Sequence, residues 1–270
     1  TARNSVAMYK ISMVSLGCPK NQVDAEMMLA TLKTAGFEIG APEAEADAII
    51  INTCGFNEDA KKEAIENILE AAEYKKTGKC KALIVTGCLA ERYKNDVTEE
   101  IPEVDVCVGI GADGDIAKIV TDALNGSKEN VFADKYELNL NSDRILGGYP
   151  FSTYLKIGDG CDNCCTYCAI PKIRGRMRSR TIEDCVKEAE KLAAGGVKEL
   201  TVVAQDTTAY GEDIYGKPML AKLLSELCKI EGLHWIRTLY TYPDRITDEL
   251  LETVAREEKL VKYFDIPLQH

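Results

Sequence analysis

The stretch CDNCCTYC (residues 161–168) places four cysteines within eight positions of a 270-residue chain. Cys161, Cys165 and Cys168 form a C-x3-C-x2-C motif that leaves Cys164 over, whereas two C-x2-C pairs would be typical of a zinc site. Two pairs that share adjacent cysteines are poorly placed for a tetrahedron, so we favour the three-cysteine interpretation. The chain has only two histidines, which nearly excludes sites rich in imidazole and leaves thiolate ligation open.

Composition limits the class of protein. The chain is 46% hydrophobic and 29% charged, an ordinary globular balance, and no apolar run reaches the roughly 18–20 residues of a membrane span. The N-terminus lacks the apolar stretch of a signal peptide, so we expect a cytoplasmic protein whose eleven cysteines stay reduced. The net charge of −11 counts against DNA or RNA as partner and favours a basic protein.

Short apolar runs alternate with helical patterns in the first half. DAIIINT (47–53) and KALIVTG (81–87) are near-continuous apolar runs, typical of parallel strands buried on both faces. We therefore predict an α/β fold whose first domain, residues 1–124, is a doubly wound parallel sheet. GIGADG (109–114) matches a dinucleotide-binding pattern, but it follows the fourth strand, so we interpret it as an ordinary turn. The predicted strands are 10–17, 47–53, 81–87 and 104–110, and the predicted helices are 20–35, 57–76 and 113–124.

Residues 125–150 have no sustained periodicity and are rich in Asn, Asp, Gly and Ser, which predicts a linker. The alternation then resumes over 151–270, where Thr181 and Asp184 form a capping box at the start of a helix. A parallel barrel needs more units to close than this segment supplies, so we expect a truncated partial barrel. The predicted strands are 153–160, 198–205, 234–241 and 261–268, and the predicted helices are 182–194, 217–230 and 247–257.

Three further cysteines each follow a predicted strand of the first domain: Cys18 in SLGCPKN, Cys54 in INTCGF and Cys88 in VTGCLA. The carboxyl ends of parallel strands meet at one edge, where open α/β sheets bind ligands, so these thiols should converge. Cysteines of the core would fall within strands rather than after them, which makes buried structural thiols the weaker interpretation.

YLKIGDGCDNCCTYCAIP (154–171) resembles the radical S-adenosylmethionine (SAM) superfamily, whose C-x3-C-x2-C motif has an aromatic residue, here Tyr167, before its last cysteine. Together with the three upstream cysteines, the sequence resembles the methylthiotransferase family over essentially its whole length. The resemblance implies two 4Fe–4S clusters, each with three thiolate ligands and one open iron, and SAM as cosubstrate. The implied ligands are Cys161, Cys165 and Cys168 for one cluster and Cys18, Cys54 and Cys88 for the other.

Within the family, Pro19-Lys20-Asn21 resembles the branch that adds a methylthio group to the β-carbon of an aspartate in the twelfth small-subunit ribosomal protein. The resemblance implies two SAM molecules, one methylating a sulfur and one giving the radical that abstracts hydrogen from the substrate. It also implies a reducing partner such as flavodoxin or ferredoxin. The last barrel units and a small C-terminal domain that contacts RNA or protein are expected to be missing from these residues. The alternatives are a tRNA adenosine methylthiotransferase and, from another class, an iron–sulfur electron carrier or scaffold.

No catalytic side chain is predicted beyond the cluster ligands. Gln205 and Asp206 end a predicted barrel strand where relatives contact the amino group of SAM. Four basic side chains are candidates for binding the carboxylate of SAM or substrate. They are Lys156, Arg174, Arg176 and Arg178. Tyr240, Gln269 and His270 also lie at expected strand ends.

Overall fold

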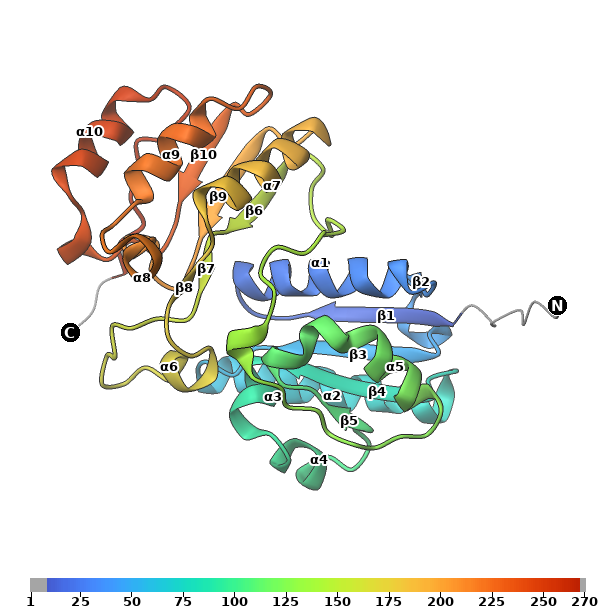
Figure 1. The fold of residues 1–270 in the computed structure, drawn as a ribbon. Coiled ribbons are helices and arrows are strands. Elements are labelled where there is room, and N and C mark those ends of the chain that lie inside the picture. Colours follow the sequence, from blue (N-terminus) through green and yellow to red (C-terminus); the bar gives the residue numbers. More distant parts are fainter. Residues whose placement is uncertain (1–8, 268–270) are drawn as a thin grey trace. The chain divides into compact units, whose positions relative to one another are not determined.

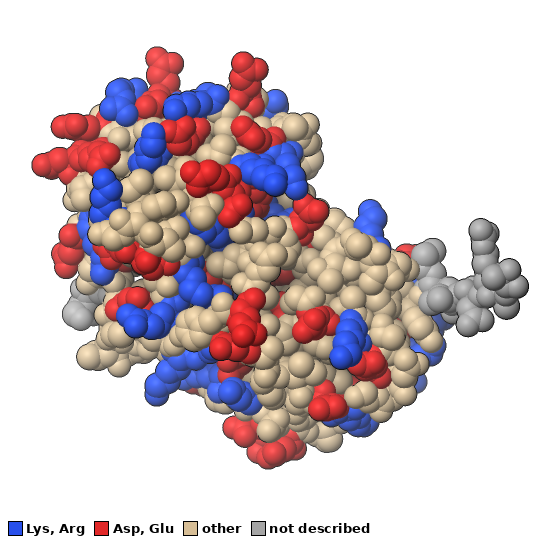
Figure 2. All heavy atoms as spheres, viewed as in Figure 1, with Lys and Arg blue, Asp and Glu red and all other residues tan. Residues whose placement is uncertain are grey.

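The structure is a computed structural model that describes residues 9–267. The chain divides into two compact units at the bond between Ile145 and Leu146, and each is described by itself. In the part that is described, no helix is long and apolar enough to cross a membrane. Acidic and basic side chains are interspersed on the face shown in Figure 2.

The first unit is a parallel sheet with the strand order β2-β1-β3-β4-β5 (Figure 1). Its strands are β1 (Lys10–Ser15), β2 (Glu38–Ile39), β3 (Ala48–Thr53), β4 (Ala82–Gly87) and β5 (Val106–Cys107). Its helices are α1 (Pro19–Thr34), α2 (Glu58–Thr77), α3 (Cys88–Tyr93), α4 (Asp96–Glu100) and α5 (Ile116–Leu124). The predicted parallel α/β sheet is confirmed.

Alternate residues of the central strands point to opposite faces, and each face has its own core. Ile49 and Ile51 of β3 pack in one core with Ile68 of α2. Ile50, between them, packs in the other core with Met28 of α1 and residues of α5. All six residues of β3 are therefore buried, which explains its continuous apolar sequence.

The end of this sheet differs from the prediction. The strand predicted over 104–110 is short, because a 3-10 helix (Ile110–Asp115) begins soon after it and α5 follows. The segment expected as a linker, 125–150, packs on the first unit over much of its length. Val131 bridges Val108 beside β5, and Arg144 pairs with Glu26 of α1 at 3.6 Å.

The second unit has a three-stranded parallel sheet in the order β10-β9-β6. Its strands are β6 (Ser152–Lys156), β9 (Glu199–Val203) and β10 (Trp235–Thr238), and an antiparallel pair is formed by β7 (Gly158–Asp159) and β8 (Arg178–Ser179). Its helices are α6 (Ile170–Ile173), α7 (Ile182–Ala194), α8 (Glu212–Tyr215), α9 (Leu220–Cys228) and α10 (Asp248–Arg256). Residues of α7, α9 and α10 share one core with the strands. Among the described residues the three strands form an open sheet.

The cap predicted at Thr181 is confirmed, because its side chain accepts a hydrogen bond from Asp184 N at the start of α7. The strand predicted over 261–268 does not form among the described residues, where a bridge joins Ile236 and Leu260. The ladder beside β10 is interrupted at Tyr240, whose φ is 60° and whose backbone N–H donates to the Asp265 carboxylate rather than to a carbonyl.

Candidate functional site

Cys18, Cys54 and Cys88 lie in three turns that contact one another at the carboxyl ends of β1, β3 and β4. Gly17, with φ of 90°, lies so close to Cys54 that an added Cβ would be 3.1 Å from the Cys54 Sγ. A Cβ on Gly55 would lie 2.7 Å from the Cα of Leu89, the residue after Cys88. Glycine is therefore required for the close approach of these turns.

A buried side chain, Asn21 of α1, connects the same three turns. Its Nδ2 donates to the carbonyl of Leu16 at 3.1 Å and to the carbonyl of Thr53 at 2.8 Å. Its Oδ1 lies 3.6 Å from the Cys88 Sγ and accepts the thiol hydrogen. Since amide nitrogen donates and carbonyl oxygen accepts, the two carbonyl partners fix the orientation of the Asn21 amide.

The first unit thus fits a group that takes three thiolates. Among the residues that the structure describes, no three His, Cys, Asp or Glu side chains are close enough together to hold a single metal ion. A cluster is less demanding in this respect, because each thiolate binds a different iron at its own corner. Cys18 also caps the N-terminus of α1, where the helix dipole favours a thiolate.

In the second unit, the loop that carries Cys161, Cys165 and Cys168 follows β7. The loop turns sharply at Gly160, where φ is 77° and an added Cβ would be 2.0 Å from the carbonyl oxygen of Arg176. Two backbone N–H groups donate to cysteine sulfurs at 3.5 Å: that of Asn163 to Cys161 and that of Ile170 to Cys168. Such N–H groups stabilise sulfur that carries negative charge.

The thiols of this loop are close enough to influence one another electrostatically. Burial raises the pKa of the Cys161 thiol, and charges on Asp206, Cys168 and Cys165 raise it further. Cys164 differs from the other three cysteines: it is exposed, and its φ of 49° lies in the left-handed region.

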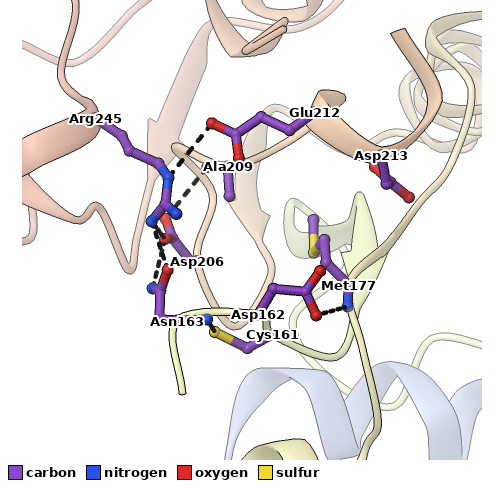
Figure 3. Close-up of a pocket in the computed structure, with 9 residues that line it drawn as sticks. All are labelled: Cys161, Asp162, Asn163, Met177, Asp206, Ala209, Glu212, Asp213 and Arg245. Atoms are coloured by element: carbon purple, nitrogen blue, oxygen red, sulfur yellow. Dashed lines mark hydrogen bonds and ion pairs between the residues drawn. The ribbon is translucent and has the colours of Figure 1, made fainter. Parts of the chain in front are cut away.

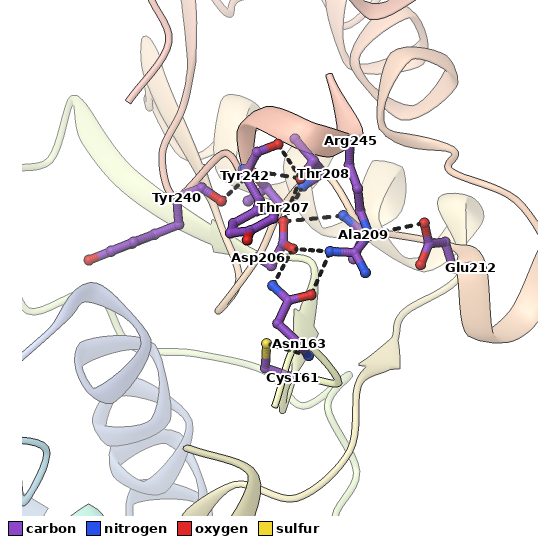
Figure 4. Close-up of polar contacts among 10 residues, drawn as sticks. All are labelled: Cys161, Asn163, Asp206, Thr207, Thr208, Ala209, Glu212, Tyr240, Tyr242 and Arg245. Atoms are coloured by element: carbon purple, nitrogen blue, oxygen red, sulfur yellow. Dashed lines mark hydrogen bonds and ion pairs between the residues drawn. The ribbon is translucent and has the colours of Figure 1, made fainter. Parts of the chain in front are cut away.

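A pocket lies beside Cys161 at the end of β9 (Figure 3). Asp206, which follows this strand, and Arg245, which follows β10, line it together with Asn163 of the cysteine loop. The Arg245 side chain pairs with Asp206 at 3.1 Å and with Glu212 at 3.3 Å. The Tyr240 ring points away from this group in Figure 4.

The predicted basic residues Lys156 and Arg174 lie against Asp159, a fully buried carboxylate. Lys156 Nζ is 3.2 Å and Arg174 NH1 is 3.0 Å from Asp159 Oδ2. Burial alone would raise the pKa of Asp159, but Arg174, Lys156 and Arg178 hold it well below its usual value. The side chains of Arg174, Lys156 and Arg178 therefore surround the Asp159 carboxylate.

Gln205 joins this group from the end of β9. Its Nε2 donates to Asp159 Oδ1 at 2.9 Å, while its Oε1 is buried with no hydrogen-bond partner among the described residues. Arg176, in contrast, is exposed and pairs with Asp162 at 3.3 Å. Gln269 and His270 lie outside the described residues.

Asp159, Asn163 and Arg245 were missed by reasoning from the sequence. Asp159 and Asn163 lie two residues before and two residues after Cys161, so their closeness to the cysteine motif could have indicated them. Arg245 lies 82 residues from its partner Asn163, and no local pattern indicates that contact.

Comparisons with known proteins give matches over both units. Residues 10–109 match the family described as uncharacterized protein family UPF0004, and residues 155–270 match the radical SAM superfamily. Two curated relatives are ribosomal protein uS12 methylthiotransferases RimO. That of Clostridioides difficile is 51% identical over 265 residues, covering 97% of this chain and 60% of the relative. That of Clostridium botulinum is 52% identical over 264 residues, with coverages of 97% and 59%.

The chain thus spans about 60% of the length of these relatives. Among solved structures, the radical SAM methyltransferase TsrM from Kitasatospora setae, determined with cobalamin and a [4Fe-4S] cluster, matches with a TM-score of 0.68. The match covers 98% of this chain and 61% of that one, and at 12% identity it supports the fold alone. Radical SAM proteins use an iron–sulfur cluster and SAM, as the cysteine motif predicts. Over nearly its whole length the chain is therefore similar to the uS12 methylthiotransferases, and its second unit matches the radical SAM superfamily.

Proposed function

We propose that the protein adds a methylthio group to the β-carbon of an aspartate in ribosomal protein uS12, using two 4Fe–4S clusters and two SAM molecules. The observation that carries this proposal is the presence of two separate sets of three cysteines at strand ends, one in each unit, in a chain about 50% identical to uS12 methylthiotransferases. A pure electron carrier or scaffold would need neither SAM nor a barrel-type α/β domain beside its cysteines.

The proposed ligands are Cys161, Cys165 and Cys168 in the second unit, and the three cysteines of the first unit, Cys18, Cys54 and Cys88. Bound to these thiolates, the clusters would supply the electron that cleaves SAM and the sulfur that is transferred, chemistry that side chains cannot perform at neutral pH. Cys164 is assigned no ligand role, in agreement with its exposure and left-handed backbone.

The protein's own contribution at the second unit is to bind and orient SAM. Gln205 Oε1, buried and without a partner among the described residues, can accept a hydrogen bond from the amino group of SAM, and Asp206 lies next to it. Lys156, Arg174 and Arg178 gather around Asp159 and are the candidates for binding a carboxylate of SAM or substrate. Arg176, which is exposed, is a candidate for contacting the substrate instead.

The substrate, electron donor and location follow from the same proposal. An acidic protein with Pro19-Lys20-Asn21 in the first turn of α1 fits a basic ribosomal protein better than tRNA, which remains the second candidate. We further propose a cytoplasmic protein that receives electrons from a flavodoxin or ferredoxin.

Anaerobic reconstitution with iron and sulfide tests the cofactors: two four-iron clusters predict about eight irons per chain. The substrate is tested with the full-length protein, SAM and a reductant, offering uS12 and tRNA in parallel. Mass spectrometry should find a methylthio group on an aspartate of uS12. Methylthiolated adenosine in tRNA without modified aspartate would overturn the assignment.

A further inference from the structure

We propose that Arg245 is a positioning residue that holds the cysteine loop through Asn163 and thereby sets the hydrogen bond to Cys161. Arg245 lies in a 3-10 helix after β10 (Pro243–Arg245), whereas Asn163 lies two residues after Cys161. The inference deepens the proposed function, because it rests on Cys161 being a cluster ligand.

The contacts among Arg245, Asn163 and Asp206 form a closed triangle (Figure 4). Arg245 NH1 donates both to Asn163 Oδ1 and, at 3.1 Å, to Asp206 Oδ2. Asn163 Nδ2 donates to the same Asp206 oxygen at 2.8 Å. A guanidinium only donates and a carboxylate only accepts, so the two partners leave one possible orientation for the Asn163 amide.

Asp206 is itself fixed by its own strand end. Its Oδ1 accepts from Thr208 N at 3.0 Å, from the Thr208 hydroxyl, and from Ala209 N at 3.3 Å. Both carboxylate oxygens are therefore engaged before SAM arrives. Asp206 is therefore held in place by its own strand end. Arg245 and Asn163 both donate to it, and through Asn163 the cysteine loop is fixed to this strand end.

The consequence reaches the sulfur through the backbone. The same Asn163 whose side chain is held donates its backbone N–H to Cys161 Sγ at 3.5 Å. Hydrogen bonds to ligand sulfurs tune the reduction potential of an iron–sulfur cluster. If the side chain of Asn163 is released, this N–H is no longer directed at the sulfur, and the reduced cluster loses part of its stabilisation.

The test compares Arg245→Gln with Arg245→Lys and with a matched control, Arg237→Gln. Arg237 of β10 pairs with Glu199 at 3.2 Å in the same unit and has similar exposure, and this pairing lies on the strands β9 and β10 rather than on the cysteine loop. Hydrogen exchange of the peptide spanning 161–165 is measured on iron-free, reduced protein. Redox titration and electron paramagnetic resonance are then measured on the reconstituted protein.

Arg245→Gln should speed exchange in this peptide by about tenfold or more, since hydrogen bonds to charged groups are lost. The cluster potential should become more negative at unchanged iron content. Arg245→Lys should recover part of both effects, Asn163→Ala should reproduce them, and Arg237→Gln should change neither. Exchange equal to that of the unsubstituted protein, or faster exchange with an unchanged potential, would overturn the proposal. Failure of the unsubstituted chain to bind iron would instead refute the proposed function, since the exchange measurement needs no iron.

Discussion

Replacing Asn21 by alanine should loosen all three cysteine turns of the first unit while leaving the second unit unchanged. The Asn21 side chain is fully buried, and its Nδ2 donates to the carbonyls of Leu16 and Thr53. Alanine removes both hydrogen bonds, and the backbone carbonyl of Thr53, a residue that is also fully buried, loses this donor.

The magnitude follows from these contacts. A hydrogen bond contributes about 1 kcal/mol net, and a buried carbonyl that loses its partner costs about 1–3 kcal/mol. Two lost bonds, one of them to a buried carbonyl, give a local destabilisation of about 2–4 kcal/mol. At 1.4 kcal/mol per factor of ten, amide hydrogens that exchange by opening of this region should exchange roughly 30 to 700 times faster.

The assay is hydrogen exchange with mass spectrometry on peptides covering β3, β4 and, as an internal reference, β9. The control is Asn67→Ala in α2, because Asn67 also donates from its side chain, at 2.8 Å to Glu63 O, but near the surface. This control should change the free energy of opening by less than about 0.5 kcal/mol. Equal exchange of β3 in the Asn21 and Asn67 variants would refute the assignment of Asn21 as the link between the turns.

Three further outcomes are expected. Glu26→Gln removes the carboxylate charge 3.6 Å from the buried Arg144 guanidinium, so exchange of the segment around Arg144 should rise by the equivalent of at most about 3–5 kcal/mol; an unchanged rate would contradict this. Burial alone would raise the pKa of Asp159, but its cationic neighbours lower it, so its stabilising contribution is complete at neutral pH and falls as the pH drops below about 4. Thermal unfolding of Asp159→Asn should therefore depend less on acid pH than that of the unsubstituted protein, and equal dependence would speak against the ion cluster. Iron content after reconstitution should fall by about half in Cys18→Ala and stay constant in Cys164→Ala; the reverse pattern would exclude the ligand sets proposed.

The fold could be predicted largely because its signals are local. The central strands β3 and β4 differ by one residue at their starts from the predicted 47–53 and 81–87, since a strand buried on both faces has a continuous apolar sequence. The cap at Thr181 was equally visible. The strand predicted at 261–268 does not form among the described residues, and Tyr240 opposite it has a left-handed backbone that no local sequence pattern predicts.

Less of the candidate site than of the fold could be predicted from the sequence. Cysteine spacing indicated which thiols matter, but it carried no information about the side chains that arrange them. The pairing of Lys156 and Arg174 with Asp159 depends on where β6, β7 and α6 end. The contact of Arg245 with Asn163 depends on how the sheet folds. The sequence therefore predicted Lys156 and Arg174 as residues that bind the carboxylate of SAM or substrate, whereas in the structure both lie against the carboxylate of Asp159.

In both units a buried or half-buried asparagine side chain holds the loop that carries the cysteines. In each, a side-chain amide close to the first cysteine of its set, Asn21 after Cys18 and Asn163 after Cys161, bridges to a neighbouring strand end. An amide suits this role because it donates and accepts at once without adding charge beside thiolates. Both loops are thereby held in place by the protein's own hydrogen bonds. With the proposed ligand sets, iron binding would then have less chain to order, so more of the binding free energy would be available to hold each proposed cluster.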